Sequence, residues 1–221
     1  GVQTCALPIL IGGGLAGCTT AASLAARGWN VSLLERHARL AEEASGNPQG
    51  VLYLKLSAHG TALSQLILSG FGHTRRLLEH LHRGVDWDGC GVLQLAFNAK
   101  EAERQAQLAA AFAPGLLHPL DQAQAQARAG VALEHGGLFF PEGGWVHPPA
   151  LCEWQARHPL INVLTHHEAL ELQRVDGQWH ALAGDTLLAS ATVVVLAGAA
   201  EIKRFPFRDR KSTRLNSSHP L

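Results

Sequence analysis

The stretch from Ile9 to Glu35 constrains the fold more than any other part of the chain. It begins with a short apolar run, continues through a glycine-rich turn, and becomes an alanine-rich segment that ends at Gly28. A second apolar run, Trp29 to Leu34, leads directly to the acidic residue. A strand, a glycine turn, a helix, a second strand and an acid, in this order and at this spacing, predict a dinucleotide-binding βαβ unit.

Each glycine of the turn has a separate geometrical role. Gly12 permits the tight turn off the strand, and Gly14 lacks a Cβ atom, so a pyrophosphate can approach its backbone. Gly17 allows the helix to pack closely against the strands, and the N-terminal end of that helix attracts phosphate. The residues expected around the phosphates are Gly12, Gly13, Gly14, Leu15, Ala16 and Gly17.

The acid indicates which nucleotide the unit binds. Glu35 follows the turn by the roughly 20 residues at which a carboxylate accepts hydrogen bonds from a ribose diol, and its charge disfavours the 2′-phosphate of NADP. A loop of small residues at 44–50 and a late strand that ends in Ala197-Gly198 favour the longer FAD over NAD. A nucleotide-binding module without catalytic activity stays open as an alternative.

The composition is that of a globular protein with an apolar core. Of the 221 residues, 47% are hydrophobic and 16% charged, and the formal net charge is zero. The chain as a whole thus has no strong electrostatic attraction for nucleic acid, and a local basic face stays open as an alternative. Neither CxxC nor HExxH spacing occurs, so we expect no metal site and a reducing compartment. Neither an apolar run of about 20 residues nor a secretory signal occurs, so we expect a cytoplasmic protein without membrane contact.

The segments of the chain predict an interrupted lobe. Residues 9–57 open the nucleotide-binding lobe, 58–146 form a helical segment and part of an inserted α+β substrate lobe, and 147–207 return to the first lobe. Residues 1–8 and 208–221 resemble translated sequencing adapter, so we expect them to be non-native, and we expect Gly1–Thr4 and Lys211–Leu221 to be exposed. The expected class is α/β, with a Rossmann-like parallel sheet, an inserted lobe and a truncated C-terminal end.

Helical signals occur mainly in the middle of the chain. An apolar stripe predicts a helix over 57–82, which the glycines near residue 70 can break. Asn98 with Glu101 and Asp121 with Gln124 have the spacing of capping boxes.

Strand signals follow. Residues 136–146 predict two short strands across a tight turn, and Asp176-Gly177 predicts a hairpin. The continuous apolar run 192–197 predicts a parallel strand buried on both faces.

The native stretch resembles the FAD-dependent amine-oxidising family that includes D-amino acid oxidase and glycine oxidase. Within it, the likeness is greatest to the oxidoreductase half of the bifunctional proteins of tRNA 5-methylaminomethyl-2-thiouridine biosynthesis. The Ser-Gly-Asn-x-Gln-Gly segment at 45–50 and the Gly-Gly-Trp segment at 143–145 are specific to the family. The matching stretches are Ile11–Gly17, Ala44–Ser57, Cys90–Leu95, Gly137–Pro148 and Val193–Ala197.

The resemblance implies a reaction and two partners. In these bifunctional proteins, FAD oxidises the carboxymethylaminomethyl group of wobble 2-thiouridine in tRNA. A C–N bond becomes an imine, hydrolysis releases glyoxylate, and a methyltransferase domain on the same polypeptide acts next. The implied partners are therefore a tRNA substrate and that methyltransferase domain. A free amino acid oxidase of the glycine or D-amino acid type is the alternative.

The resemblance also assigns residues to the cofactor. It places the pyrophosphate at Gly12, Gly14 and Gly17 and the adenosine ribose at Glu35. The other assigned positions are Arg36, Ala44, Ser45, Gly46, Asn47, Gly50, Ala169 and Ala197. The sequence departs from the family at Leu54, where proline is usual, and at Ala197-Gly198-Ala199, where Ala-Asn-Gly is usual. No motif identifies a catalytic acid or base, as expected where a cofactor carries the redox chemistry.

Overall fold

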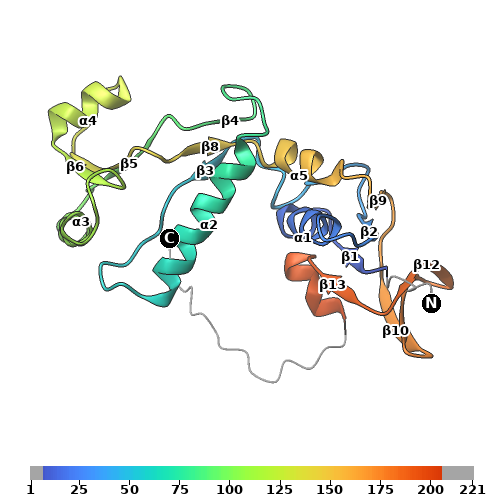
Figure 1. The fold of residues 1–221 in the computed structure, drawn as a ribbon. Helices are drawn as coiled ribbons and strands as arrows, with labels where there is room; N and C mark the ends of the chain where they lie inside the picture. The colour runs from blue at the N-terminus through green and yellow to red at the C-terminus, as the bar shows by residue number, and fades with distance from the viewer. Residues whose placement is uncertain (1–6, 206–221) are drawn as a thin grey trace. The chain divides into compact units, whose positions relative to one another are not determined.

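The computed structural model describes residues 7–205, which form two compact units (Figure 1). The first unit combines Gly1–Leu40 with Ala156–Leu221, and the second is Ala41–Gln155. A unit inserted between two parts of another agrees with the expected α/β class, which is confirmed. The boundaries 9–57, 58–146 and 147–207 divide the chain by function and not by compactness, so they stay a prediction. The expected exposure of the two chain ends concerns residues outside the described range.

A four-stranded parallel sheet forms the centre of the first unit, in the order β13-β1-β2-β9. Its strands are β1 (Ile9–Ile11), β2 (Val31–Leu34), β9 (Ile161–Leu164) and β13 (Val194–Leu196). Helix α1 (Leu15–Ala25) connects β1 to β2 and packs against both strands. Pro8 lies directly before β1, and its carbonyl accepts a hydrogen bond of 3.0 Å from Ser32 N, so the proline extends the ladder as an acceptor.

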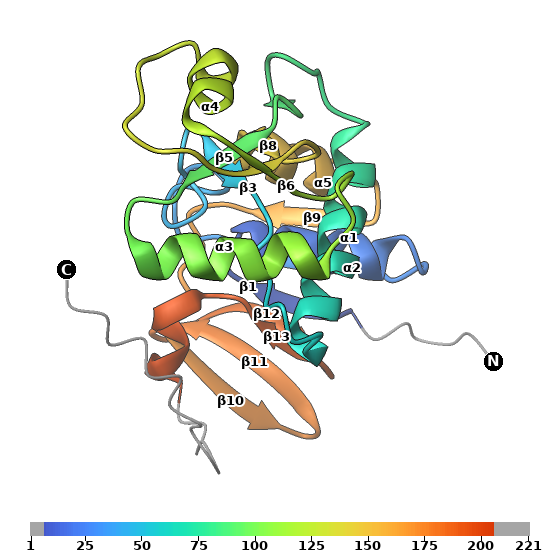
Figure 2. The ribbon, with the colours of Figure 1, turned by 90° about the vertical axis from the view of Figure 1, so that its left-hand side faces the viewer.

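A second sheet belongs to the same unit (Figure 2). It is antiparallel, with the strands β10 (Glu171–Val175), β11 (Gln178–Ala183) and β12 (Thr186–Ala191) in sequence order. The predicted hairpin is confirmed, because Asp176 and Gly177 connect β10 to β11 with the positive φ angles of a type I′ turn. A 3₁₀ helix, η1 (Ala199–Arg204), follows β13. One core joins the two sheets through Ile9, Leu34, Ala169, Leu172, Ala181, Ala191 and Phe205.

The prediction that the late apolar strand is buried on both faces is wrong. All three residues of β13 are half-buried, and in the described part of the chain the strand lies at the edge of the parallel sheet. An edge strand has one neighbour, so its apolar residues lack the cover that a central strand has on both sides.

The second unit contains two three-stranded antiparallel sheets, in the orders β3-β8-β4 and β5-β7-β6. Its elements are β3 (Gly50–Leu52), α2 (Ala62–Leu78), β4 (Trp87–Asp88), β5 (Val92–Leu95), α3 (Ala99–Ala111), β6 (His118–Leu120), α4 (Gln122–Ala129), β7 (Gly137–Phe140), β8 (Gly144–Val146) and α5 (Pro148–Ala156). Its core contains Leu54, Leu56, Leu108, Leu117, Leu138 and Phe140. Leu54, which stands where the family has proline, is thus a buried core residue.

The strands β7 and β8 are the two short strands predicted across a tight turn, and Gly143 N donates to Phe140 O within that turn. They do not pair with each other: β7 pairs with β5 and β6, whereas β8 pairs with β3 and β4. Glycine permits this arrangement, since a Cβ atom on Gly137 would overlap the Gln94 carbonyl, and one on Gly144 would overlap the Asp88 carbonyl.

The helix α2 is shorter than predicted and has no break. The Thr61 side chain accepts a hydrogen bond from Ser64 N, so the helix begins after Thr61 and not at residue 57. It then continues through Gly70 and Gly72 to Leu78, because isolated glycines weaken a helix without ending it.

The two predicted capping boxes have different outcomes. The box of Asp121 and Gln124 is complete, with hydrogen bonds of 2.8 and 3.0 Å. Asn98 does cap α3, but the Glu101 carboxylate binds Arg104 at 2.6 and 2.9 Å. These hydrogen bonds to Arg104 lower the pKa of Glu101.

Candidate functional site

The carboxyl edge of the parallel sheet is the candidate site. Three neighbouring strands end there in register, at Leu196, Ile11 and Leu34. The central strand β1 lies between β2, which follows it directly in the chain, and β13, which comes from the returning segment. In open α/β sheets, ligands bind outside the carboxyl ends of the strands at such a change of direction.

The glycine turn fits tightly into this edge. Gly12 has a φ of +110°, and a Cβ atom there would lie 2.8 Å from the Ala197 carbonyl oxygen. Ala197 N in turn donates to Ile11 O at 2.8 Å, so the predicted residues Gly12 and Ala197 meet. A Cβ atom on Gly17 would overlap the Gly12 carbonyl oxygen. Helix α1 therefore begins directly against the turn, the packing expected from Gly17.

The start of α1 suits a negatively charged group. Gly14 is its N-cap, with extended backbone angles of −83° and −172°, and it is half-buried. Gly14 itself supplies no side-chain hydrogen bond to this helix, and the first turn, which includes Leu15 and Ala16, contains no acid. The partial positive charge of the helix end therefore meets no protein anion from its own first turn.

Glu35 is held firmly beside this turn. Glu35 is only 7% exposed, and its Oε2 atom accepts a hydrogen bond of 2.8 Å from Gly13 N. Oε1 accepts from His37 N, also at 2.8 Å. An ionised carboxylate offers about four acceptor positions, so two backbone bonds leave capacity for ribose hydroxyls. The sequence indicated the acid but gave no sign of these two donors.

The segment after β9 runs beside Glu35. His167 N donates to the Glu35 carbonyl and His166 N to the His37 carbonyl, each at 2.9 Å. Ala169 then enters the core cluster that also contains Leu34. The structure thus brings Ala169 into the neighbourhood of the predicted ribose acid.

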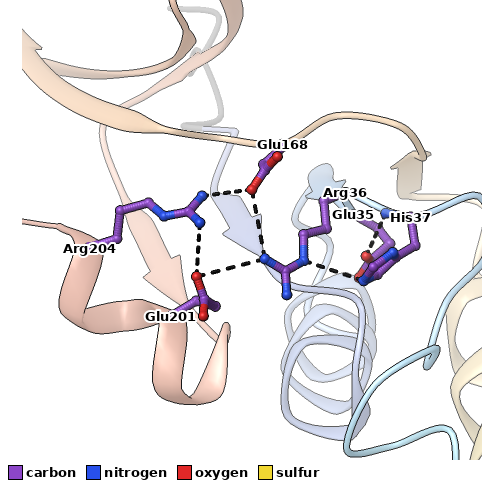
Figure 3. A network of polar contacts seen from close by, with 6 residues as sticks. All are labelled: Glu35, Arg36, His37, Glu168, Glu201 and Arg204. Atoms are coloured by element: carbon purple, nitrogen blue, oxygen red, sulfur yellow. Dashed lines mark hydrogen bonds and ion pairs between the residues drawn. The ribbon is translucent and has the colours of Figure 1, made fainter.

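Arg36 lies in a group of charges that the sequence analysis missed (Figure 3). Its Nη1 atom is 3.7 Å from both Glu168 Oε1 and Glu201 Oε2. Arg204 binds the same two oxygens, at 2.7 and 2.9 Å. We call these residues the four-residue ring: Arg36, Glu168, Arg204 and Glu201. No spacing pattern could have indicated it, because its members come from three separate parts of the chain.

The ring shifts the acidity of its members. The hydrogen bond from Arg204 and the positive charges of Arg204 and Arg36 lower the pKa of Glu168. The same hydrogen bond to Glu168 raises the pKa of Arg204.

The remaining predicted residues lie in the second unit, in the loop before β3 and, for Gly50, at the first position of that strand. Ala44, Gly46 and Asn47 are exposed, and Ser45 and Gly50 are half-exposed. A Cβ atom on Gly46 would lie 2.7 Å from the Ala41 carbonyl oxygen, so the loop requires glycine there. Their contact with a cofactor stays a prediction.

Residues 7–205 contain neither a membrane-spanning helix nor a metal-binding cluster. No helix in this range is long and apolar enough to cross a membrane. The range also contains no cluster of three or more His, Cys, Asp or Glu side chains arranged to hold a metal ion.

Two relatives share most of this sequence. Both are named tRNA 5-methylaminomethyl-2-thiouridine biosynthesis bifunctional protein MnmC. The protein from Pseudomonas fluorescens is 81% identical over 198 residues, which are 90% of this chain and 30% of that protein. The protein from Pseudomonas putida is 71% identical over 197 residues, 89% of this chain and 30% of that protein. The chain thus spans about three tenths of the length of these relatives.

Solved structures share the fold. Glycine oxidase from Bacillus cereus superposes with a TM-score of 0.68 at 20% identity, over 86% of this chain and 55% of that chain. Fructosamine oxidase from Aspergillus fumigatus gives 0.70 at 18% identity, over 93% and 51%. A profile of the family described as FAD dependent oxidoreductase matches residues 9–216. The chain therefore belongs to the FAD-dependent oxidoreductase family, as the resemblance of its sequence implied.

Proposed function

We propose that this chain is part of an enzyme that oxidises a secondary amine on tRNA. The proposed substrate is the carboxymethylaminomethyl group of wobble 2-thiouridine, and glyoxylate is the released product. One observation carries the proposal: identity of 81% over 198 residues to a protein of tRNA 5-methylaminomethyl-2-thiouridine biosynthesis. A methyltransferase domain elsewhere on the complete polypeptide and a cytoplasmic location belong to the same proposal.

The residues at the sheet edge fit FAD. In the proposed complex, Gly12, Gly14 and Gly17 surround the pyrophosphate, and the N–H groups at the start of α1 face its charge. Glu35 accepts hydrogen bonds from the adenosine ribose hydroxyls, for which its two backbone donors hold it in place. Bound FAD supplies the two-electron oxidation that converts an amine to an imine.

The other assigned residues have secondary roles in this proposal. Gly13 donates to Glu35 and so orients the ribose acceptor. Ala197 supplies the backbone against which Gly12 turns. The loop residues Ala44, Ser45, Gly46, Asn47 and Gly50 approach the flavin, Ala169 contributes backbone near adenine, and Arg36, Leu15 and Ala16 border the nucleotide.

The test uses the complete protein, expressed from the uninterrupted gene. The purified protein should show flavin absorbance and should release glyoxylate from tRNA that carries the carboxymethylaminomethyl group. Unmodified transcript of the same tRNA is the control and should release none. Faster oxidation of free glycine or of a D-amino acid would favour a free amino acid oxidase. A protein without flavin absorbance would be a nucleotide-binding module of another kind.

A further inference from the structure

We infer that the four-residue ring, and Arg204 in particular, positions Glu35 for the nucleotide ribose. The inference rests on the proposed cofactor site and assigns Arg204 a part in it. Arg204 is a positioning residue, since it acts on Glu35 through Arg36 and the two glutamates.

The ring connects the loops that follow three parallel strands. Arg36 follows β2, Glu168 follows β9, and Glu201 and Arg204 lie on η1, which follows β13. Arg204 makes the short contacts of 2.7 and 2.9 Å, and Arg36 completes the ring at 3.7 Å (Figure 3). Backbone hydrogen bonds of His166 and His167 already join the loops after β2 and β9. The four side chains thus add the connection from these two loops to η1 after β13.

Arg36 transmits this constraint to the ribose acid. It lies between Glu35 and His37, and the hydrogen bond from His37 N to Glu35 Oε1 spans its backbone. The Arg36 Nε atom also lies 3.3 Å from the His37 ring nitrogen Nε2, to which it donates. An Arg36 side chain held by the ring therefore restricts the turn that sets the direction of the Glu35 carboxylate.

The contacts between the loops after β1, β2 and β13 form a closed series at the carboxyl edge of the sheet. Glu35 binds Gly13 after β1, and Gly12 packs on Ala197 after β13. The ring supplies the remaining connection, from Arg36 to Glu201. Loss of that connection removes one restraint on the turn after Glu35, so a larger fraction of molecules should hold the carboxylate in directions that do not bind ribose. The apparent affinity then falls in proportion to the competent fraction.

The expected effect is modest. The ring side chains are between 31 and 47% exposed, and exposed ion pairs contribute little individually. Two positive and two negative charges cancel, so the ring acts by geometry and not by attracting phosphate. Breaking both contacts of Arg204 should raise the dissociation constant for FAD about 3- to 10-fold.

The experiment compares variants of the complete protein in FAD titrations of the apo form. Arg204→Gln should show the 3- to 10-fold loss, and Arg204→Lys, which retains the charge, should recover part of it. Arg83→Gln is the matched control, because Arg83 makes an exposed ion pair of 2.8 Å with Asp88 in the second unit. Its FAD affinity should equal that of the wild type.

Further readouts separate positioning from general stability. With FAD saturating, Arg204→Gln should retain the wild-type kcat and KM for the tRNA substrate. In 1 M salt, which screens exposed pairs, the affinity of the wild type should approach that of the variant. Glu201→Gln, which leaves the contact of Arg204 with Glu168, replaces Arg204→Gln if that variant does not fold.

Two results would overturn the inference. Wild-type affinity in both Arg204→Gln and Glu201→Gln would show that the ring does not position Glu35. A loss in Arg83→Gln equal to that in Arg204→Gln would show a general charge effect. A wild-type protein that binds no flavin overturns the proposed function together with this inference, whereas the first two results leave the proposed function intact.

Discussion

The glycine-rich segments at 12–17 and 136–144 each contain four glycines, and these glycines have different roles in the structure. In the first, the turn lies at the carboxyl edge of a parallel sheet, beside a buried acid and the start of a helix. In the second, Gly137 and Gly144 allow two strands to approach carbonyl groups of separate antiparallel sheets. Glycines alone therefore do not indicate a nucleotide site; the acid and the helix start distinguish it.

The largest expected effect is that of Gly14→Val on cofactor binding. The extended backbone of Gly14 accepts valine without strain, so the fold should persist. The added side chain should exclude the pyrophosphate from the backbone. Loss of two hydrogen bonds to a charged group, each worth ~1.5–3 kcal/mol, would weaken FAD binding by roughly 10²- to 10⁴-fold. Titration of FAD into the folded variant checks this, and unchanged affinity would remove the glycine turn from the cofactor site.

Matched alanine substitutions test the comparison directly. A Cβ atom would overlap a carbonyl oxygen at Gly17 in the first segment and at Gly144 in the second. Each of Gly17→Ala and Gly144→Ala should therefore lower the free energy of unfolding by about 1–3 kcal/mol, measured by chemical denaturation. FAD affinity should fall in Gly17→Ala alone. An equal fall in Gly144→Ala would mean that both segments serve the cofactor.

The acid beside the first segment should respond to a loss of charge. Both carboxylate oxygens of Glu35 accept backbone N–H groups, so the amide of Glu35→Gln must turn its NH₂ group toward one of them. A buried donor left without an acceptor costs about 1–3 kcal/mol, and FAD binding should weaken about 10-fold. Isothermal titration measures the change. A loss of FAD affinity as large as that in Gly14→Val would contradict the predicted ranking.

A third small-residue segment, 197–199, extends the comparison. Ala199 has a φ of +47°, whereas Gly198 has a φ of −84° that any residue can adopt. The family has glycine at the position of Ala199, and the structure retains the backbone that this glycine requires. The exchange of both residues, Gly198→Ala with Ala199→Gly, should stabilise the protein by about 0.4–1 kcal/mol. A lower melting temperature of the double variant would contradict this.

The smallest expected effect concerns pH. The pKa of Glu168 lies below its ordinary value of 4.5, mainly because Arg204 donates a hydrogen bond to it. Its ionisation therefore stabilises the fold fully above pH 4.5, and this contribution disappears as the pH falls through the lower, folded-state pKa. At an exposed site the loss should be a few tenths of a kcal/mol.

Denaturation curves between pH 6 and 3 check the pH effect against Glu168→Gln, which should lack it. Glu101, whose pKa Arg104 lowers in the second unit, is the matched site. Glu101→Gln should remove a similar dependence there without changing FAD affinity. A pH dependence that is identical in wild type and Glu168→Gln would contradict the assignment.

Sequence reasoning succeeded where the signal is local. The turn after Ile11, the hairpin at Asp176-Gly177 and the cap at Asp121 depend on neighbouring residues, and the structure has them as predicted. It failed where partners come from distant segments. Nothing near β8 indicates that it pairs with β3, and nothing near Arg36 indicates Glu201. The burial of β13 was misjudged because an apolar run does not show how many neighbours a strand has.

The parallel sheet also sets an order of assembly during synthesis. Ile9 pairs with Ser32 and with Val194, so β2 leaves the ribosome soon after β1, whereas 185 positions (194 − 9) separate β1 from β13. At about 5–20 residues per second, β1 waits about 10–40 s for that neighbour. The whole second unit emerges in this interval, and its compaction shortens the free chain that the last pairing must close. The junction of Gly12 with Ala197 is therefore completed only after Ala197 has left the ribosome.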